Sequence, residues 1–485
     1  MSGRPRRRPR SRPARLERGL HRRAVAVVPG HGLTAWVNRL SDWGVLWLGL
    51  GAAMAAAGNR FGRRAATRGL LSAAIASAVA NGPVKMLARR RRPAAAPLAA
   101  RLLRLRSPSS SSLPSGHTAT AFAFAAGAAQ EAPLVGVPLL GLASLVGFSR
   151  VHSGLHHPSD VALGAAIGVG SALATRRLWP VAPREPARVG RPYTASEVDP
   201  APGGRGVVVV VNAAAGSGEA AAEALREELP DAKVVVVDDP DDLAAALDDA
   251  ASGAGAMGVA GGDGTVNAAA ALAAEHGKPL LVVPGGTLNH FAFAAGLETV
   301  ADAAAAVREG HVATVDLALI DGRAFLNTAS LGSYVDLVDA RERLEGRIGK
   351  WPAVVVALVR VLRHAEPVVV EVDGVRRRLW MIFVGNCRYH PSGFAPSWRE
   401  CLDDGQLDVR IVDASQPWSR LRLLVAVLTG RLGRSRVYEQ RYVPELRLRS
   451  TEGPLRLARD GETFDAGEAV TITKAPEPLV VYVTP

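Results

Sequence analysis

Hydrophobic positions follow one pattern in the first third of this chain and a different pattern in the rest. In the first third, apolar runs nearly free of charge are separated by clusters of arginine. The runs are Trp43–Gly58, Gly69–Ala80, Thr118–Ala129, Leu134–Phe148 and Val161–Ala174. A helix of about 16 residues extends about 24 Å, less than the ~30 Å hydrocarbon core of a bilayer, so flanking residues must complete each crossing. The charge distribution favours an all-α transmembrane helical bundle over a soluble alanine-rich one.

From Val207 onward, short β-branched runs alternate with amphipathic stretches. The stretches 219–228, 241–251 and 266–276 predict helices, and the runs predict buried parallel strands at Val207–Val211, Lys233–Val237, Met257–Ala260 and Pro279–Val283. Strand–turn–helix repeats indicate a doubly wound α/β sheet that binds ligands at the carboxyl ends of its strands. After about Ala313, strand patterns predominate up to a last predicted strand at Leu479–Val483, which indicates an antiparallel β-rich second lobe.

The chain is therefore expected to have several domains. We expect a helical membrane domain followed by a two-lobed region, with five segments in all: a basic disordered arm at 1–23, the membrane-embedded domain at 24–177, a linker rich in Pro, Gly and Arg at 178–206, an α/β lobe at 207–313 and a β-rich lobe at 314–485.

The net charge of +13 narrows the possible partners to nucleic acid, an anionic membrane surface or phosphorylated substrates. No aromatic residue separates the arginines of the arm at 1–23, which argues against nucleic acid and favours an anionic membrane surface. The two cysteines, Cys387 and Cys401, provide neither a disulfide framework nor a zinc-ligand spacing.

Three polar segments lie at the ends of the apolar runs. They are Lys85 to Arg92-Pro93, Pro114-Ser115-Gly116-His117, and Ser149-Arg150 to His156 and Asp160. Together they could cleave a phosphate ester without a metal ion: cations hold the phosphate oxygens, one histidine attacks, a carboxylate orients it, and the second histidine protonates the leaving oxygen. A charge at the bilayer centre costs ~2.5–3.5 kcal/mol or more, so such residues belong at span ends.

With these motifs, residues 43–176 resemble the type 2 phosphatidic acid phosphatase family of membrane lipid phosphatases. The resemblance implies that His156 is the nucleophile and forms a phosphohistidine, that Asp160 is its partner and that His117 is the general acid. It further implies a set of phosphate-binding residues: Lys85, Arg92, Ser115, Gly116 and Arg150.

The resemblance also implies a site that faces away from the cytosol. Three predicted spans follow Lys85, which brings Arg176-Arg177 to the cytosolic side, as the positive-inside rule prefers. Only two predicted spans precede Lys85, which would leave the basic arm outside, so the side of the N-terminus stays open.

A glycine turn at Val259–Asn267 links a predicted strand to a predicted helix. Its glycines reach positive φ easily and allow a phosphate close to the backbone, while the helix N-terminus behind them attracts an anion. Asp263 in this turn would repel phosphate unless a metal ion lies between them or the carboxylate handles a proton. The chain contains neither GxxxxGK[ST] nor GxGxxG, which excludes a P-loop fold and weighs against a dinucleotide site.

The motifs GGDGTxN, beginning at Gly261, and PGGTLN, beginning at Pro284, resemble those of the bacterial diacylglycerol kinase catalytic family, which includes sphingoid-base kinases. The resemblance covers 207–485. It implies a set of ATP-binding residues: Asn212, Gly261, Gly262, Asp263, Gly264, Thr265, Asn267, Gly286 and Thr287.

The same resemblance implies two roles in the β-rich lobe. Glu462, in the turn Asp460-Gly461-Glu462, is the implied catalytic base for a lipid hydroxyl, while Asp263 lies near the transferred phosphate. Asp404, with the backbone carbonyls of Cys401 and Gln406, is the implied ligand of a structural Mg²⁺. Without the resemblance, both Asp-Gly turns would be read as hairpin turns.

Two positions depart from the kinase pattern. Asn212 is followed by Ala213 where the family has Asn-Pro, and His290 stands where the family usually has Asp. The flanking sequence around His290 resembles a bacterial subgroup that carries histidine there, which leaves the identity of the substrate open.

The leading hypothesis is a bifunctional, multi-pass enzyme of the cell membrane. An outward-facing phosphatase would dephosphorylate a lipid, and a cytoplasmic kinase would phosphorylate a lipid hydroxyl using ATP and Mg²⁺. The expected lipids are diacylglycerol, phosphatidic acid or polyprenyl phosphate. The alternatives are a lipid kinase whose helical half acts only as an anchor, and a non-enzymatic sensor of nucleotide or lipid.

Overall fold

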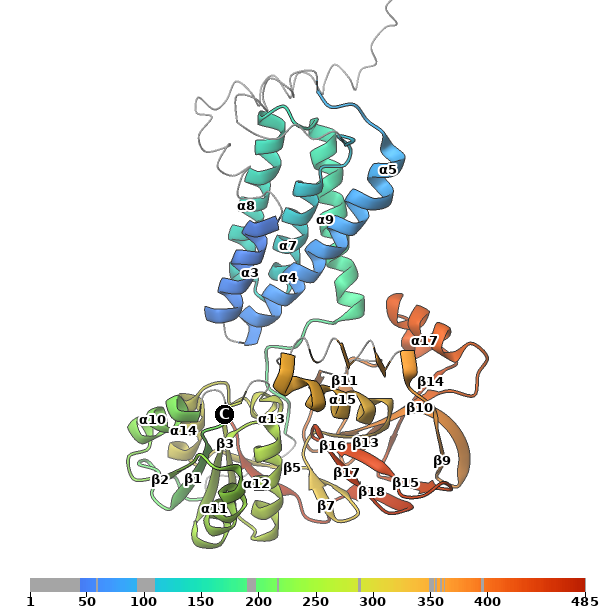
Figure 1. Cartoon of the computed structure of the whole chain (residues 1–485). Helices are drawn as coiled ribbons and strands as arrows, with labels where there is room; N and C mark the ends of the chain where they lie inside the picture. The colour runs from blue at the N-terminus through green and yellow to red at the C-terminus, as the bar shows by residue number, and fades with distance from the viewer. Residues whose placement is uncertain are drawn as a thin grey trace, which may run out of the picture. The chain divides into compact units, whose positions relative to one another are not determined.

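The computed structural model describes residues 44–57, 60–93, 110–189, 198–215, 218–286, 289–348, 363–393 and 397–484, and a few positions between 353 and 361. The basic arm at 1–23 and part of the linker lie outside the described residues. The chain divides into two compact units, which meet between Ala182 and Pro183 (Figure 1).

The first unit is a helical bundle in which each apolar run forms a helix. Its helices are α3 Val45–Ala57, α4 Arg60–Val79, α5 Lys85–Ala88, α7 Gly116–Glu131, α8 Pro133–His152 and α9 Pro158–Leu178 (Figure 1). A π-helical turn at Ala80–Val84 joins α4 to α5, since Pro83 cannot donate the regular helical hydrogen bond and Gly82 has non-helical angles. The bundle therefore confirms the expected all-α fold of this region.

Helix α7 is the centre of the bundle and packs against α4, α8 and α9. Its small side chains let the neighbouring helices come close. A Cβ atom at Gly164 of α9 would lie 2.6 Å from the Ser115 carbonyl oxygen, and one at Gly168 would lie 2.5 Å from that of Ala119. Glycine is therefore required at both positions for α9 to lie against α7.

Three of the described helical segments are long and apolar enough to cross a membrane: Arg60–Ala88, Pro133–His152 and Pro158–Leu178. The apolar part of α3, Val45–Ala56, is shorter. Helix α7 has only 16 residues and lies inside the bundle, although the sequence predicted a span there. Five spans were expected, and three of these helices reach spanning length.

A buried ion-pair cluster joins three helices near the end of the bundle that leads into the linker. Glu131 of α7 accepts hydrogen bonds from Arg64 Nε at 3.0 Å and from Arg68 Nε at 2.8 Å, and the side chains of Arg68 and Glu131 are fully buried. Arg68 also donates to the carbonyl of Trp179, just after α9. Each charge in this apolar setting depends on its partners.

We predict that Arg68→Gln lowers the free energy of unfolding by roughly 3 kcal/mol or more, because it leaves a buried carboxylate with one cation in place of two. Arg63→Gln, an exposed position of the same helix, should change it by less than about 0.5 kcal/mol. The change in unfolding free energy of each variant is measured on the detergent-purified chain, from the loss of its helical circular dichroism signal as SDS is added. Equal effects of the two substitutions would contradict a structural role for the cluster.

The second unit begins with a six-stranded sheet in the order β2-β1-β3-β4-β19-β5 (Figure 1). Its strands are β1 Val207–Asn212, β2 Lys233–Val237, β3 Ala256–Gly261, β4 Leu280–Pro284, β5 Val312–Val315 and β19 Leu479–Tyr482. Its helices are α10 Gly218–Glu228, α11 Pro240–Gly253, α12 Asp263–Glu275, α13 His290–Ala294 and α14 Val300–Glu309. The chain moves outward from β1 to β2 and then back across to β3, so right-handed crossovers put α10 on one face and α11 and α12 on the other.

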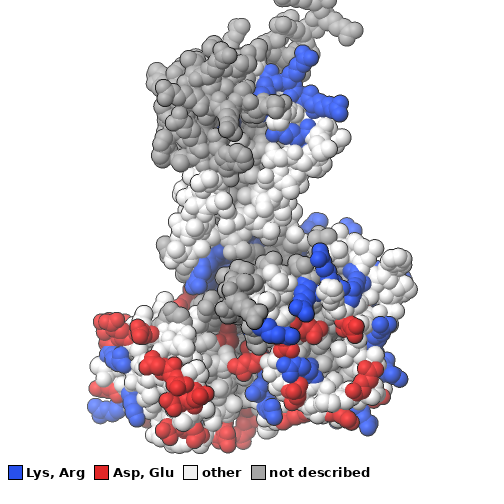
Figure 2. Space-filling view, viewed as in Figure 1, with Lys and Arg blue, Asp and Glu red and all other residues white. Residues whose placement is uncertain are grey.

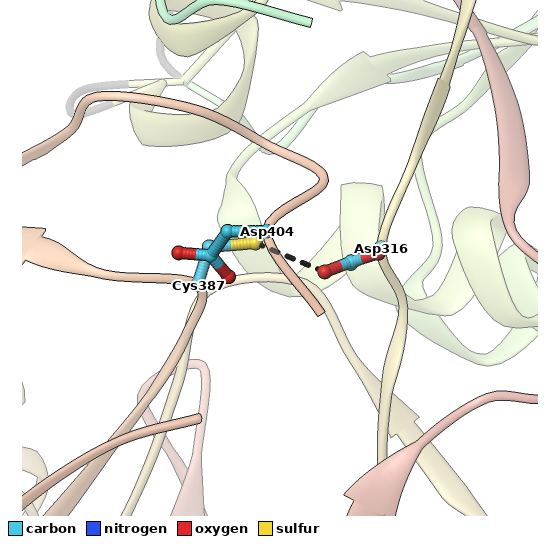
Figure 3. A group of neighbouring side chains, drawn as sticks. All are labelled: Asp316, Cys387 and Asp404. Atoms are coloured by element: carbon cyan, nitrogen blue, oxygen red, sulfur yellow. Dashed lines mark hydrogen bonds between the residues drawn. The ribbon is translucent and has the colours of Figure 1, made fainter. Parts of the chain in front are cut away.

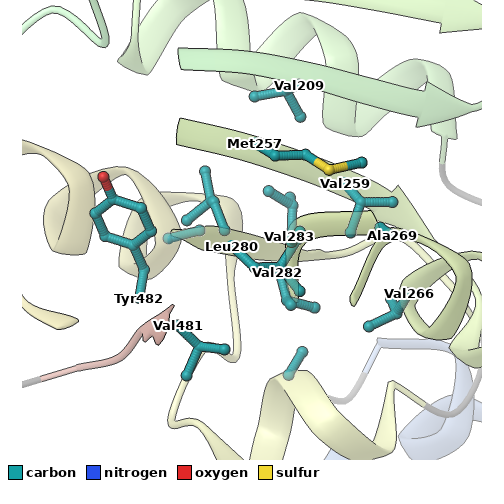
Figure 4. Packing of buried hydrophobic residues seen from close by; sticks show 14 of the residues in the cluster. Val209, Met257, Val259, Val266, Ala269, Leu280, Val282, Val283, Val481 and Tyr482 are labelled. Atoms are coloured by element: carbon teal, nitrogen blue, oxygen red, sulfur yellow. The ribbon is translucent and has the colours of Figure 1, made fainter. Parts of the chain in front are cut away.

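Valine, leucine and alanine side chains from both faces of this sheet form its core. Figure 4 shows Val259, Leu280 and Val282 packed with Val266 and Ala269 of α12. Strands buried on both faces explain the continuous apolar runs in the sequence. The predicted doubly wound sheet is confirmed.

The remaining strands form a mainly antiparallel second lobe. An eleven-stranded sheet follows the order β17-β16-β8-β10-β9-β15-β18-β6-β7, with β13 pairing β10 and β14. The strands are β6 Ala318–Ile320, β7 Arg323–Phe325, β8 Thr328–Gly332, β9 Val368–Val372, β10 Val375–Asn386, β13 Leu407–Asp413, β14 Tyr438–Val443, β15 Glu445–Ser450, β16 Arg456–Arg459, β17 Glu462–Asp465 and β18 Ala469–Lys474. Two short strands, β11 Tyr389–His390 and β12 Trp398–Arg399, pair separately.

The structure corrects the sequence interpretation of this lobe at two points. Strand β19 was expected within the second lobe, but it lies in the first sheet, parallel to β4 and antiparallel to β5. Its apolar residues are mostly buried there, and a local pattern does not specify which sheet a strand joins. Helices α15 Ser333–Ile348 and α17 Ser419–Leu428 were not predicted in a segment that otherwise reads as strands.

Candidate functional site

The predicted phosphatase residues gather around one cavity of about 710 Å³ in the helical unit. The polar part of its lining comes from the end of α4, the π-helical turn, α5, the start of α7, the end of α8 and the segments next to these helices. It comprises Ser77, Asn81, Lys85, Arg92, Ser110, His117, Thr120, Arg150 and His156, with Gly116 beside them. Two predicted residues are not among the lining residues: Ser115 caps α7 and bonds Thr118, and Asp160 is fully buried behind His156.

His156 lies in the loop between α8 and α9, outside both apolar helices. Its Nδ1 atom is 2.7 Å from the carbonyl oxygen of Ser112. Because a carbonyl only accepts, Nδ1 must carry the proton, and the lone pair is then on Nε2, 3.4 Å from a guanidinium nitrogen of Arg92. Burial lowers the pKa of His156 to about 4, so the ring is neutral at physiological pH. A neutral imidazole with a lone pair on Nε2 is suited to nucleophilic attack.

Asp160 is held in place by donors on both of its carboxylate oxygens. Oδ2 accepts the backbone N–H of His157 at 2.9 Å and lies 3.7 Å from Nδ1 of His156, and Oδ1 accepts Nη1 of Arg90 at 2.8 Å. Arg90 is therefore a positioning residue that the sequence analysis missed. It is one of four consecutive arginines, 89 to 92, and only the three-dimensional structure shows which of them turns toward Asp160.

Apolar side chains from two helices also line the cavity. Trp47 and Leu48 of α3 and Leu70, Ala73 and Ala74 of α4 line it. A ligand that fills the cavity must therefore combine an anionic group with an apolar part.

The kinase motifs meet at the carboxyl ends of β1, β3 and β4. The two glycine turns touch backbone to backbone: a Cβ atom at Gly285 would lie 2.9 Å from the Gly261 nitrogen, and one at Gly286 would lie 2.7 Å from Gly262 Cα. From β1, Asn212 Nδ2 donates to Thr265 Oγ1 at 3.2 Å. Of the predicted ATP-binding residues, Thr287 lies outside the described residues.

Asp263 begins α12 between the two lobes. Its Oδ1 accepts the backbone N–H of His290 at 3.0 Å. Glu462 comes from β17, and its Oε1 is 2.8 Å from the position a Cβ atom of Gly264 would occupy. Glycine at 264 thus lets the carboxylate of one lobe reach the helix N-terminus of the other, which brings the predicted acidic pair to one place.

Two further residues hold this junction together. The side-chain amide of Asn267, a predicted ATP-binding residue, bonds the second lobe: it donates to the Ala324 carbonyl at 3.2 Å and accepts the Leu326 N–H at 3.1 Å. Asp460, two residues before Glu462, accepts the backbone N–H groups of residues 326, 327 and 328 at 2.8 to 3.0 Å. Burial raises the pKa of Asp460 to about 6, and these three donors oppose the rise.

The predicted metal ligand Asp404 lies in an acidic cluster. Ligand atoms of Asp316, Cys387 and Asp404 lie within 4.8 Å of one another (Figure 3). Asp404 accepts backbone N–H groups from Arg388 and Gln406, and the Gln406 carbonyl accepts that of Cys387. The oxygens of Asp404 and Gln406 each keep a lone pair, and oxygen donors of this kind suit Mg²⁺.

The other members of the cluster fit Mg²⁺ less well. Burial raises the pKa of the Cys387 thiol to about 12, and a neutral thiol is a poor ligand for a hard cation. Lys474 Nζ is 2.9 Å from Asp316 Oδ2, so an ammonium group already balances that carboxylate. Asp316 and Lys474 were both missed in the sequence, because nothing in their local pattern distinguishes them.

We predict that Arg90→Gln lowers kcat for phosphate release from a lipid phosphate by roughly tenfold to a hundredfold, because Asp160 loses its cationic partner and His156 its orientation. KM should change little, since Arg90 does not line the cavity. Arg91→Gln, with an exposed side chain next to it, is the matched control. A rise in KM with unchanged kcat would mean that Arg90 binds substrate instead.

Comparison with protein families divides the chain into three parts. The PAP2 superfamily matches residues 66–184, the diacylglycerol kinase catalytic domain matches 206–320, and the YegS C-terminal NAD kinase beta sandwich-like domain matches 334–483. The PAP2 match and the three apolar helices indicate a membrane protein.

Individual relatives cover the same parts. A probable lipid kinase YegS-like from Pseudomonas syringae pv. syringae is 32% identical over 46% of this chain and 73% of its own length. A diacylglycerol kinase structure from Bacillus anthracis is 21% identical, with a TM-score of 0.42, over 57% of this chain and 97% of its own. A transmembrane PAP2 type phosphatidylglycerolphosphate phosphatase structure from Bacillus subtilis is 22% identical, with a TM-score of 0.28, over 34% of this chain and 84% of its own. The chain therefore belongs to the YegS-like lipid kinase family and carries a PAP2 superfamily domain fused ahead of its kinase domains.

Proposed function

We propose that the chain is a bifunctional membrane enzyme. Its helical unit hydrolyses a lipid phosphate without a metal ion, and its second unit transfers phosphate from ATP to a lipid hydroxyl such as that of diacylglycerol. The observation that carries the first half is a cavity lined both by cations with two histidines and by apolar side chains from α3 and α4. That combination fits a phosphate joined to an apolar chain.

In the proposed hydrolysis, Lys85, Arg92 and Arg150 neutralise the phosphate oxygens. The lone pair on His156 Nε2 attacks phosphorus, the bond to the lipid oxygen breaks, and His117 protonates that oxygen. Water then attacks the phosphohistidine, gives its proton to His117, and releases inorganic phosphate. The Ser112 carbonyl and Asp160 keep the attacking ring in one tautomer and one orientation.

In the proposed kinase reaction, the glycine turns and the N-terminus of α12 hold the phosphates of ATP. Glu462 takes the proton of the lipid hydroxyl, whose oxygen attacks the γ-phosphorus as ADP leaves. Asp263 lies beside the transferred phosphate. Asp404 and the carbonyls of Cys401 and Gln406 would hold Mg²⁺, whose positive charge would stabilise the 401–406 loop.

We further propose that the chain crosses the cell membrane several times, with the kinase unit in the cytoplasm and the phosphatase cavity facing outward. Arg176 and Arg177 at the end of α9 support this orientation by the positive-inside rule, and ATP is available only in the cytoplasm. The membrane would then separate two opposed reactions.

The decisive experiment uses two assays on detergent-purified protein. In the first, the protein is incubated with a membrane lipid extract and γ-labelled ATP; in the second, phosphate release from phosphatidic acid is followed. Label should enter one lipid with the unmodified chain and fall at least a hundredfold with Asp263→Ala or Glu462→Gln, while Glu275→Ala, at the far end of α12, behaves as the unmodified chain.

His156→Ala tests the other half. It should abolish phosphate release, because no other group of the cavity occupies the place of the nucleophile. Unchanged release would overturn the phosphatase proposal and favour a lipid kinase anchored by its helical unit. No labelled lipid under any condition would overturn the kinase proposal.

Mg²⁺ binding at Asp404 has a readout that does not require turnover. We expect Mg²⁺ to raise the unfolding midpoint of the chain without ATP, with about 2.7 kcal/mol of stabilisation at a hundredfold excess over Kd. Asp404→Asn should remove the shift, whereas Asp403→Asn in the same loop should largely retain it. An equal shift in both variants would place the ion elsewhere.

A further inference from the structure

Helix α17 and the turn after it have no role in either proposed reaction, yet their composition and their position at the surface are distinctive. They connect β13 to β14 and lie at the surface of the second lobe (Figure 1). Between Ser415 and Val437 the chain carries five arginines and no acidic residue. This segment, 415–437, is called the α17 segment below.

The outer face of α17 is apolar. Of eight exposed large apolar or aromatic side chains in the described part of the second unit, four lie within eight consecutive positions, and their exposed fractions are 79% for Trp418, 54% for Leu421, 49% for Leu424 and 51% for Val425. Positions 421, 424 and 425 share one helical face. Apolar side chains scattered singly need no explanation, whereas a cluster of this kind marks an interaction surface.

The opposite face anchors the helix to the lobe, so its orientation is defined. Ser419 and Ala426 are buried, and Trp380 Nε1 donates to Ser419 Oγ at 3.1 Å. The Arg420 guanidinium lies 4.5 Å from the centre of the Trp380 ring and donates to the carbonyl of Ala365. The helix therefore presents Leu421, Leu424 and Val425 outward on a fixed support.

All charged side chains of the α17 segment itself are basic. The five arginines at 420, 422, 431, 434 and 436 are all exposed. Basic side chains gather over the part of the second lobe that carries α17, while acidic side chains are more prominent on the first lobe (Figure 2). An apolar helical face with a tryptophan at its start and arginines around it matches an interfacial helix, which lies in the plane of a bilayer surface.

We propose that the α17 segment docks the second lobe onto an anionic membrane surface. Its apolar face enters the headgroup boundary, and the arginines contact lipid phosphates. A bilayer is within reach, because the linker joins this lobe to a unit with three helices long enough to cross a membrane, which makes the effective concentration of the surface high. The inference depends on neither proposed reaction.

The test places an environment-sensitive dye on the full chain in vesicles. Leu424→Cys carries the dye on the proposed surface, and Val375→Cys, with 55% exposure at the start of β10, is the matched control. The unsubstituted chain, labelled in the same way, corrects for Cys387 and Cys401. The vesicles contain phosphatidylcholine with or without one part in three of phosphatidylglycerol, and brominated acyl chains quench any dye that reaches the hydrocarbon boundary.

We expect strong quenching of the dye at 424 in anionic vesicles and little at 375. Replacing Arg431 and Arg434 by Gln should weaken the docking equilibrium on the order of tenfold in anionic vesicles, and have little effect in neutral ones. Leu421→Asp, made in the Leu424→Cys chain, should remove the quenching while leaving the circular dichroism unchanged.

Two results would overturn the proposal. Equal, weak quenching at both positions would show that the α17 segment stays in water. The other result is a blue shift in the emission of the dye at 424 that grows with protein concentration in detergent, without quenching in vesicles. It would show that the apolar face of α17 binds a second copy of the chain. Because this test measures no turnover, a negative result would refute membrane docking by the α17 segment and would leave both proposed reactions untouched.

Discussion

Both units depend on hydrogen-bond donors that surround a carboxylate removed from solvent, fully for Asp160 and partly for Asp460. Asp160 and Asp460 both lie beside a candidate site, and both would be costly in an apolar setting without partners. Asp160 receives the N–H of His157 and the guanidinium of Arg90, and Asp460 receives three consecutive backbone N–H groups. In each case the donors offset the cost of burial, and the carboxylate lies close in the chain to a candidate site residue, His156 in one unit and Glu462 in the other.

The same constraint explains the architecture of the helical unit. Helices rich in Ala and Gly pack closely around α7, and two groups of charged side chains stand out among the described residues of this unit. One is the Arg64–Glu131–Arg68 cluster near the linker end, where charges neutralise one another. The other is at the cavity, where cations from α5 and the 150–156 region gather around a neutral histidine. The first group stabilises the bundle, and the second lines the cavity.

In the second unit, the junction between the lobes is assembled from backbone contacts. Glycines at 261, 262, 285 and 286 bring two turns together, Gly264 makes room for Glu462, and Asn267 ties α12 to the start of the second lobe. The return of β19 to the first sheet adds a second covalent link between the lobes. These contacts hold Asp263 and Glu462 in one place without a direct bond between them.

The sequence alone determined the elements and the chemical inventory, because periodicity and glycine turns are local properties. The five apolar helices, the alternating strands and helices of 207–284 and the residue types of both sites could all be read from it. Tertiary structure decided what depends on long-range neighbours: that Arg90 supports Asp160, that Asn267 binds backbone, that Lys474 balances Asp316, and that β19 joins the first sheet. A side chain's partner is set by packing between segments far apart in the chain, and no local pattern records it.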